Sequence, residues 1–215
     1  MGKRVFLDNA ATTPMAPEII DMMSDMMKSH FANPSSVHSF GRESKIVVEN
    51  ARKSIAKLLN TAPGTIFFTS GGTEADNMAI KCGIHDHKIT HAITSKISHH
   101  AVLFPLQDLE KEGVIKLSYV DIDNDGVISL SHLKELLESN DRAFVSIMHA
   151  NNEIGPIQDI KSIGDVCKDY NAIFHSDTVQ TMAHFPFDIQ ELNIDFMAAS
   201  AHKFHGPKGV GFVYI

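Results

Sequence analysis

The chain has 215 residues, with 26 acidic and 19 basic side chains and a formal net charge of −7. This balance argues against a nucleic-acid-binding surface, which needs clustered Lys and Arg. Two cysteines exclude a disulfide framework, and the length is sufficient to bury a core without one. The N-terminus is too poor in apolar residues for a signal peptide, and no apolar run reaches membrane-spanning length. We therefore expect a cytoplasmic globular protein.

Two helices are expected first, over residues 17–29 and 37–59. Pro17 suits a first helical turn, and Ala62-Pro63-Gly64 marks the turn that follows the second helix. Residues 1–15 are expected to form an N-terminal segment, and residues 16–215 one large domain.

Seven short runs rich in β-branched and aromatic residues come next, and most are apolar at consecutive positions, as in strands buried on both faces. They cover residues 65–69, 91–94, 115–120, 143–148, 172–175, 195–199 and 210–215. Stretches with helical spacing, over 73–81, 101–111, 130–137 and 160–170, separate the first five. The alternation predicts an α/β fold with a mostly parallel sheet. The last connection is short for a parallel crossover, so the final strand is expected to run antiparallel.

A glycine-containing turn, Thr69-Ser70-Gly71-Gly72-Thr73-Glu74, lies where the first strand leads into a helix. Glycines let a ligand approach the backbone closely, and a helix N-terminus offers unpaired N–H groups. With the hydroxyls of Ser70 and Thr73, the turn is a candidate phosphate cradle. The alternative is a capped turn with no ligand.

Two ionisable side chains also follow strands. Asp177 lies at the carboxyl end of the fifth run, the edge at which open α/β sheets bind ligands, and it could face a cationic ring nitrogen or simply cap the next segment. Lys203 follows a strand within Ser200-Ala201-His202-Lys203. A desolvated lysine there could attack an aldehyde, whereas the alternative is a basic surface loop.

Histidine and asparagine mark two further strand ends. His99 could stack on an aromatic ligand and exchange protons near neutral pH, although lone histidines are more often structural. Asn151 and Asn152 could bind a carboxylate or ring substituent, or form an ordinary turn.

The segment Asp121-Ile122-Asp123-Asn124-Asp125-Gly126 is similar to a calcium-binding loop, but His132 stands where a bidentate Glu is required. We expect a polar turn. The 13 histidines show no metal-binding spacing, so no metal site is expected.

These motifs, in this order, resemble the cysteine desulfurases of the class V aminotransferase family, of the NifS/IscS type. The resemblance begins at Leu7-Asp8-Asn9-Ala10-Ala11-Thr12-Thr13-Pro14 and ends at Ser200–Gly209, so it covers essentially the whole chain. It implies the large domain of a PLP-dependent transferase of fold type I, built on a seven-stranded, mostly parallel sheet with flanking helices. The cofactor implied is pyridoxal 5′-phosphate (PLP), and the substrate is L-cysteine.

The resemblance also implies the site residues. Lys203 would bond to the cofactor aldehyde, Asp177 would pair with the ring nitrogen, and His99 would stack on the ring with a catalytic role. Gln180 would bind the ring hydroxyl, and Asn152 would lie beside ring and substrate. The phosphate would be held by Gly72, Thr73, Ser200 and His202.

By resemblance, the family's nucleophilic cysteine and its substrate-binding arginine would lie in a C-terminal region that this chain lacks. Cys82 and Cys167 lie on expected helices, do not align with that nucleophile and are interpreted as small buried residues. We therefore expect an N-terminal portion that lacks the C-terminal small domain and binds PLP with little turnover. By resemblance it would form a homodimer and serve a sulfur acceptor or iron–sulfur scaffold. Another class V enzyme, such as a selenocysteine lyase or aminotransferase, and a non-catalytic PLP-binding protein are the alternatives.

Overall fold

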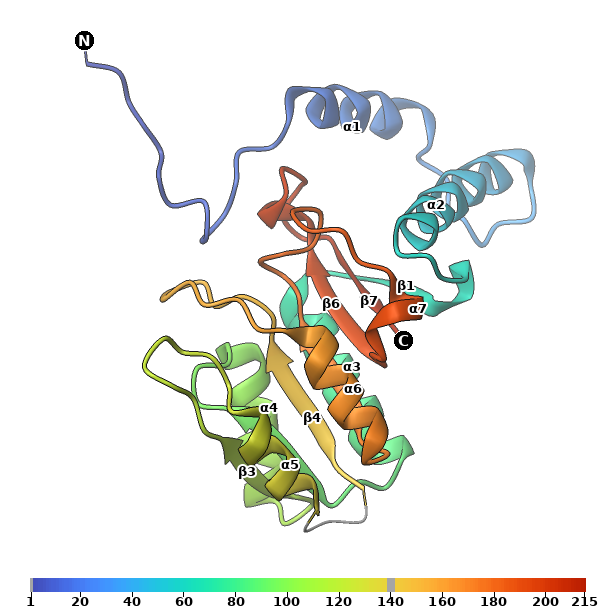
Figure 1. Cartoon of the computed structure of the whole chain (residues 1–215). Helices are drawn as coiled ribbons and strands as arrows, with labels where there is room; N and C mark the ends of the chain where they lie inside the picture. Colours follow the sequence, from blue (N-terminus) through green and yellow to red (C-terminus); the bar gives the residue numbers. More distant parts are fainter. Residues whose placement is uncertain (1, 139–141) are drawn as a thin grey trace.

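One mixed β-sheet organises the protein (Figure 1). The computed structural model describes residues 2–138 and 142–215, so Met1 of the expected N-terminal segment lies outside the described residues. The strand order is β1-β7-β6-β5-β4-β2-β3. The strands are β1 (Ile66–Thr69), β2 (His91–Ser95), β3 (Lys116–Val120), β4 (Phe144–Met148), β5 (Ile173–Asp177), β6 (Phe196–Ser200) and β7 (Gly211–Tyr214). All seven expected strands are confirmed, with boundaries that differ by one or two residues.

The last strand is the only antiparallel member among the described strands. β7 pairs antiparallel with both β6 and β1, whereas the other pairings are parallel. Only residues 201–210 separate β6 from β7, which is too short for the helical crossover that parallel neighbours need. The mostly parallel seven-stranded sheet expected from the sequence is therefore confirmed.

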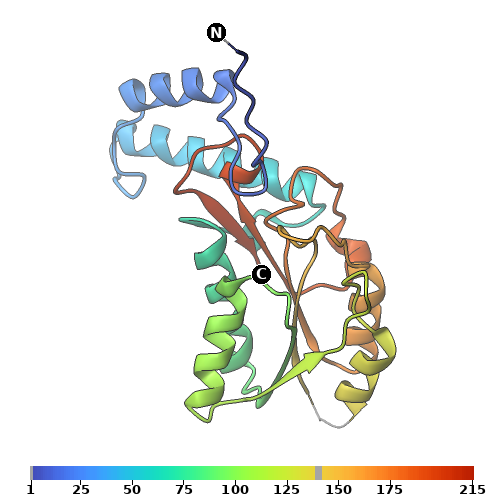
Figure 2. The same ribbon diagram turned by 90° about the vertical axis from the view of Figure 1, so that its left-hand side faces the viewer.

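Helices cover both faces of the sheet (Figure 2). α3 (Gly72–Asp86) and α4 (His100–Lys111) pack on one face, and α5 (Leu130–Glu138), α6 (Ile160–Asp169) and α7 (Ile189–Leu192) pack on the other. Each face has its own apolar core, which explains why β2, β4, β5 and β6 are buried along their whole length. The expected helices are confirmed, but α7 was missed because four residues are too few for a helical period.

Two more helices precede the sheet. α1 (Pro17–Ser29) has no buried residue, and α2 (Ser39–Leu58) places Ala56 in the core. Figure 1 shows both at the end of the molecule that also carries the N-terminal segment. α2 begins two residues later than expected, because Nδ1 of His38 accepts a hydrogen bond from the Gly41 N–H and caps the helix. Across residues 2–138 and 142–215, no helix has both the length and the apolar character needed to cross a membrane.

The calcium-loop look-alike is a polar turn, as expected. Ile122 and Ile128 form a β-bridge across it, and Oδ1 of Asp123 accepts hydrogen bonds from the N–H groups of Asp125 and Val127. The carboxylate of Asp123 therefore stabilises the turn by binding backbone N–H groups of the same loop. No group of three His, Cys, Asp or Glu side chains in the described part of the chain is placed to hold a metal ion.

Candidate active site

A cavity of about 220 Å³ opens at the edge of the sheet where the parallel strands end. Twelve residues line it: Gly72, Thr73, Asp76, His99, Met148, Asn152, Asp177, Val179, Gln180, Ser200, His202 and Lys203. All nine site residues predicted from the sequence are among them. The structure thus brings together side chains that lie up to 131 residues apart in sequence, at the edge where open α/β sheets bind ligands.

The glycine turn after β1 forms one wall. Gly71 has φ +158° and ψ −175°, a conformation that is essentially confined to glycine. A Cβ added to Gly72 would lie 2.5 Å from Cγ2 of Val179, so the turn packs directly against the segment that follows β5. The N–H of Ser70 donates to Oε2 of Glu74 at 2.6 Å, and hydrogen bonds from Ser70 lower the pKa of that carboxyl.

Of the two hydroxyl-bearing residues expected to serve this turn, only Thr73 lines the cavity. Ser70 is exposed and belongs to the cap of α3. The capped-turn interpretation therefore describes Ser70, whereas the phosphate cradle stays a prediction that Thr73 is placed to serve.

Asp177 is the last residue of β5 and is 2% exposed. Its Oδ1 accepts a hydrogen bond from the Val179 N–H at 3.0 Å, so it caps the next segment while facing the cavity. Burial raises its pKa to about 7, and the nearby carboxyl of Asp76 acts in the same direction. The side chain is therefore poised between its neutral and charged forms near neutral pH, and a bound cation would favour the charged form.

Lys203 ends the 3-10 helix η2 (Ala201–Lys203), which follows β6 directly. Its side chain is half-buried, and Nζ donates to the carbonyl oxygens of Ala10 and, at 3.0 Å, Ala11. Burial lowers the pKa of the amine, while Asp177 and Asp8 oppose that shift. A lysine with a lowered pKa has more of its amine in the free, nucleophilic form.

The N-terminal segment lies along the wall formed by η2. Oγ1 of Thr12 is 3.0 Å from Nδ1 of His202, and the Thr13 N–H donates to the His202 carbonyl at 2.8 Å. Nε2 of Gln180 donates to the Ala10 carbonyl at 3.0 Å. In the sequence, only the family resemblance pointed to these N-terminal residues, because no local pattern connects segments that are about 190 residues apart.

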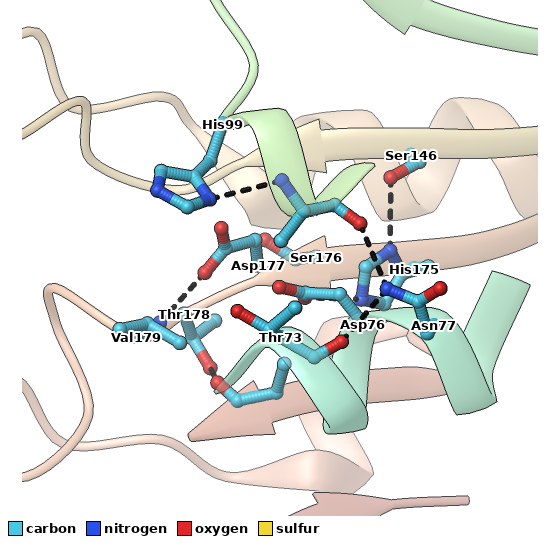
Figure 3. Close-up of polar contacts among 12 residues, drawn as sticks. Thr73, Asp76, Asn77, His99, Ser146, His175, Ser176, Asp177, Thr178 and Val179 are labelled. Atoms are coloured by element: carbon cyan, nitrogen blue, oxygen red, sulfur yellow. Dashed lines mark hydrogen bonds and ion pairs between the residues drawn. The ribbon is translucent and has the colours of Figure 1, made fainter. Parts of the chain in front are cut away.

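His99 and Asn152 also line the cavity. His99 caps α4, its Nδ1 accepting from the Ala101 N–H at 3.1 Å, and Figure 3 shows its ring close to the carboxyl of Asp177. Asn151 is occupied structurally: its Nδ2 donates to the Ile97 carbonyl, and its Oδ1 accepts two backbone N–H groups. Only Asn152 of this pair lines the cavity, so the turn interpretation describes Asn151, and the binding role of Asn152 stays a prediction.

Three lining residues, Asp76, Met148 and Val179, were not predicted. Asp76 carried a usable signal, because it stands three residues after Thr73 and therefore on the same face of α3.

Neither cysteine lines the cavity. Cys167 is buried in the core, as expected, and burial raises the pKa of its thiol well above the ordinary value. Cys82 was also expected to be buried, but it is only half-buried, and desolvation raises the pKa of its thiol. A raised thiol pKa means little reactive thiolate at neutral pH.

The model of the family described as aminotransferase class-V matches residues 5–215. The chain belongs to this family. It is 47% identical to a protein named cysteine desulfurase IscS from Dictyoglomus turgidum, over 100% of this chain and 55% of that relative. A solved structure named NifS-like protein matches with a TM-score of 0.93 at 39% identity. The match covers 99% of this chain and 59% of the chain in that structure.

A second solved structure, described as SspA in complex with cysteine, also has a TM-score of 0.93, at 34% identity over 99% of this chain and 61% of its own. This class V chain thus spans about half the length of the curated relative it matches. The resemblance stated from the sequence is confirmed. The enzymes of this class are PLP-dependent, which confirms the expected cofactor.

Proposed function

We propose that this chain supplies the PLP site of a cysteine desulfurase, which converts L-cysteine to L-alanine and transfers the sulfur to a thiol as a persulfide. The convergence of nine residues from five separate segments on one cavity carries the proposal. The identity to a protein named cysteine desulfurase supports it further.

The groups on the cavity wall suit this cofactor. PLP has a phosphate, an aldehyde and a ring nitrogen that is cationic when protonated. Thr73 and Ser200 offer hydroxyls beside the N-terminus of α3, a place that favours phosphate. The amine of Lys203 matches the aldehyde. The buried carboxyl of Asp177 matches the cation, since a buried charge is stable when it is paired.

The remaining residues surround these three positions. We assign His99 to the face of the ring, Gln180 to the ring hydroxyl and Asn152 to the space between ring and substrate. Gly72 leaves room for the phosphate, which His202 would bind together with the hydroxyls. Each of these side chains lines the cavity, which supports the assignment.

When bound, PLP withdraws electrons from an attached amino acid and makes its α-proton acidic. The role of Asp177 is to hold the ring nitrogen in its protonated form by presenting a carboxylate to it. The role of Lys203 is to accept and return the α-proton at Nζ. Burial favours this role because it lowers the pKa of the amine. In the free chain that amine is held by the carbonyls of Ala10 and Ala11, so the N-terminal segment keeps it at the cavity.

In this proposal the thiol that receives the sulfur is neither Cys82 nor Cys167. Both lie outside the cavity lining, and both have raised thiol pKa values. The accepting thiol would lie outside residues 1–215 or be supplied as an added small thiol. The family resemblance supports a cytoplasmic homodimer that delivers sulfur to an acceptor protein or an iron–sulfur scaffold.

The experiment is to add PLP to the purified chain, reduce with borohydride and map the labelled peptide. A pyridoxyl group on Lys203, absent in Lys203→Ala and retained in the exposed control Lys208→Ala, is the expected result. In a separate sample that is not reduced, L-cysteine should change the absorbance of the bound cofactor. Failure to bind PLP, or a response to typical aminotransferase substrates but not to L-cysteine, would contradict the proposal.

A further inference from the structure

Asp76 is a buried acid on the floor of the cavity for which the proposed chemistry has no use. It lies on α3 and is 1% exposed. Nε2 of His175 lies 3.3 Å from its Oδ1. The two atoms are not aligned for a hydrogen bond, and neither makes one with any other residue that the structure describes. A polar atom so placed needs an explanation, because burial without a partner costs free energy.

His175 connects Asp76 to the sheet. It is fully buried on β5, two residues before Asp177, so the two side chains emerge on the same face of the strand. Its Nδ1 lies 2.9 Å from Oγ of Ser146, the residue directly opposite on β4. Figure 3 shows the row from Ser146 through His175 to Asp76, next to Asp177.

Within residues 2–138 and 142–215, no cation is directed at Asp76 to balance a negative charge. The titratable groups that face it are His175 and Asp177 from β5, and the side chains that line the same cavity from other elements, His99, His202 and Lys203. Burial lowers the pKa of His175 to about 4, so its ring is neutral at neutral pH. The amine of Lys203 is directed to the carbonyls of Ala10 and Ala11.

A charged Asp76 would also oppose Asp177. Two neighbouring buried carboxylates repel one another, and one of them retains its proton. Burial raises the pKa of Asp76 well above its ordinary value, whereas Asp177 has a hydrogen bond from Val179 that favours its charged form. The proton therefore belongs on Asp76.

We propose that Asp76 is a positioning residue that keeps its proton at neutral pH, so that Asp177 alone becomes negatively charged on the cavity floor when a cation binds. The neutral carboxyl fills the space beside His175 without attracting the cofactor's cation away from Asp177. The inference rests on the proposed function, in which the charged carboxylate of Asp177 pairs with a cationic ring nitrogen.

The first test compares wild type with D76N in urea unfolding at pH 5, 6 and 7 without PLP. If Asp76 is protonated when folded and ionised when unfolded, the unfolding equilibrium constant of wild type, relative to D76N, rises tenfold per pH unit. A ratio independent of pH would mean that Asp76 is ionised in the folded chain, and would overturn the proposal. D86N removes an exposed carboxyl from the other end of α3 and should give a constant ratio.

The second test reads the proton directly, by infrared spectroscopy of the wild-type chain labelled with ¹³C-aspartate. At pH 8 the carbonyl band of a protonated carboxyl should be present, and it should be lost in D76N or, if that variant does not fold, in D76S. Adding PLP should leave the band in place. Absence of the band, its persistence in the Asp76 variants or its loss on adding PLP would refute the assignment. Failure of PLP to bind counts against the proposed function and not against the proton on Asp76.

Discussion

The substitution Asp177→Asn should make the free chain more stable while it impairs the site. Asparagine has the shape of aspartate, and its amide oxygen can still accept the Val179 N–H that now binds Oδ1. What the substitution removes is a carboxyl whose pKa rises from 3.8 to about 7 on folding, chiefly through burial. The difference is about 3 pKa units, and each unit corresponds to about 1.4 kcal/mol. The Asp177 carboxyl therefore lowers the free energy of unfolding at pH 7 by about 4 kcal/mol.

The sign follows from proton linkage. Because the folded pKa is raised, the folded chain retains a proton that the unfolded chain releases, so wild-type stability is lost as the pH rises from 3.8 through about 7. Asp177→Asn has no such proton. The variant and wild type should therefore be similar in stability near pH 4 and should diverge by up to about 4 kcal/mol at pH 7.

Urea unfolding of the cofactor-free chains at several pH values measures this divergence, and a PLP titration of the same samples measures the site. The affinity for PLP should fall, since a neutral amide can accept a hydrogen bond from a protonated ring nitrogen but cannot form an ion pair with it. A variant that is less stable than wild type by an amount independent of pH would show that Asp177 is already ionised in the free chain. The stability argument would then be wrong.

Lys203→Ala should abolish borohydride-trapped label while urea unfolding shows an intact fold, and label on another lysine would contradict the assignment. Gly72→Ala should destabilise the chain by about 1–3 kcal/mol and weaken PLP binding, because its new Cβ would lie 2.5 Å from Cγ2 of Val179. Cys167→Ser should cost about 1–3 kcal/mol of unfolding free energy by burying a hydroxyl in an apolar core. The half-buried Cys82→Ser should cost less, and neither serine variant should change the absorbance of bound PLP. A loss of PLP absorbance in either one would place that thiol at the site.

The seven strands were predictable because parallel strands covered on both faces need apolar residues at consecutive positions, a pattern that is local in sequence. The same holds for the motifs. Asp177 and Lys203 could be placed at the ligand-binding edge since each follows a strand, and in a parallel sheet all such ends meet. The antiparallel β7 followed from the length of one connection.

Side-chain direction was not predictable in the same way. Asn151 and Asn152 are adjacent and chemically identical, yet one is bound to its own turn and the other faces the cavity. Ser70 and Thr73 differ in the same way: Ser70 bonds to Glu74 through its backbone N–H, whereas Thr73, inside the first turn of α3, lines the cavity.

By itself, the sequence determined the order of strands and helices, the edge of the sheet that carries the polar residues and the family to which the chain belongs. Only the tertiary structure showed that the N-terminal segment lies against Lys203 and His202, and that Asp76 lies beside His175 in the cavity that Asp177 also lines. Those contacts join distant parts of the chain, and they depend on the rotation of α3 and the register of β4 with β5. Local sequence patterns fix neither quantity, because both are set by how complete elements pack together.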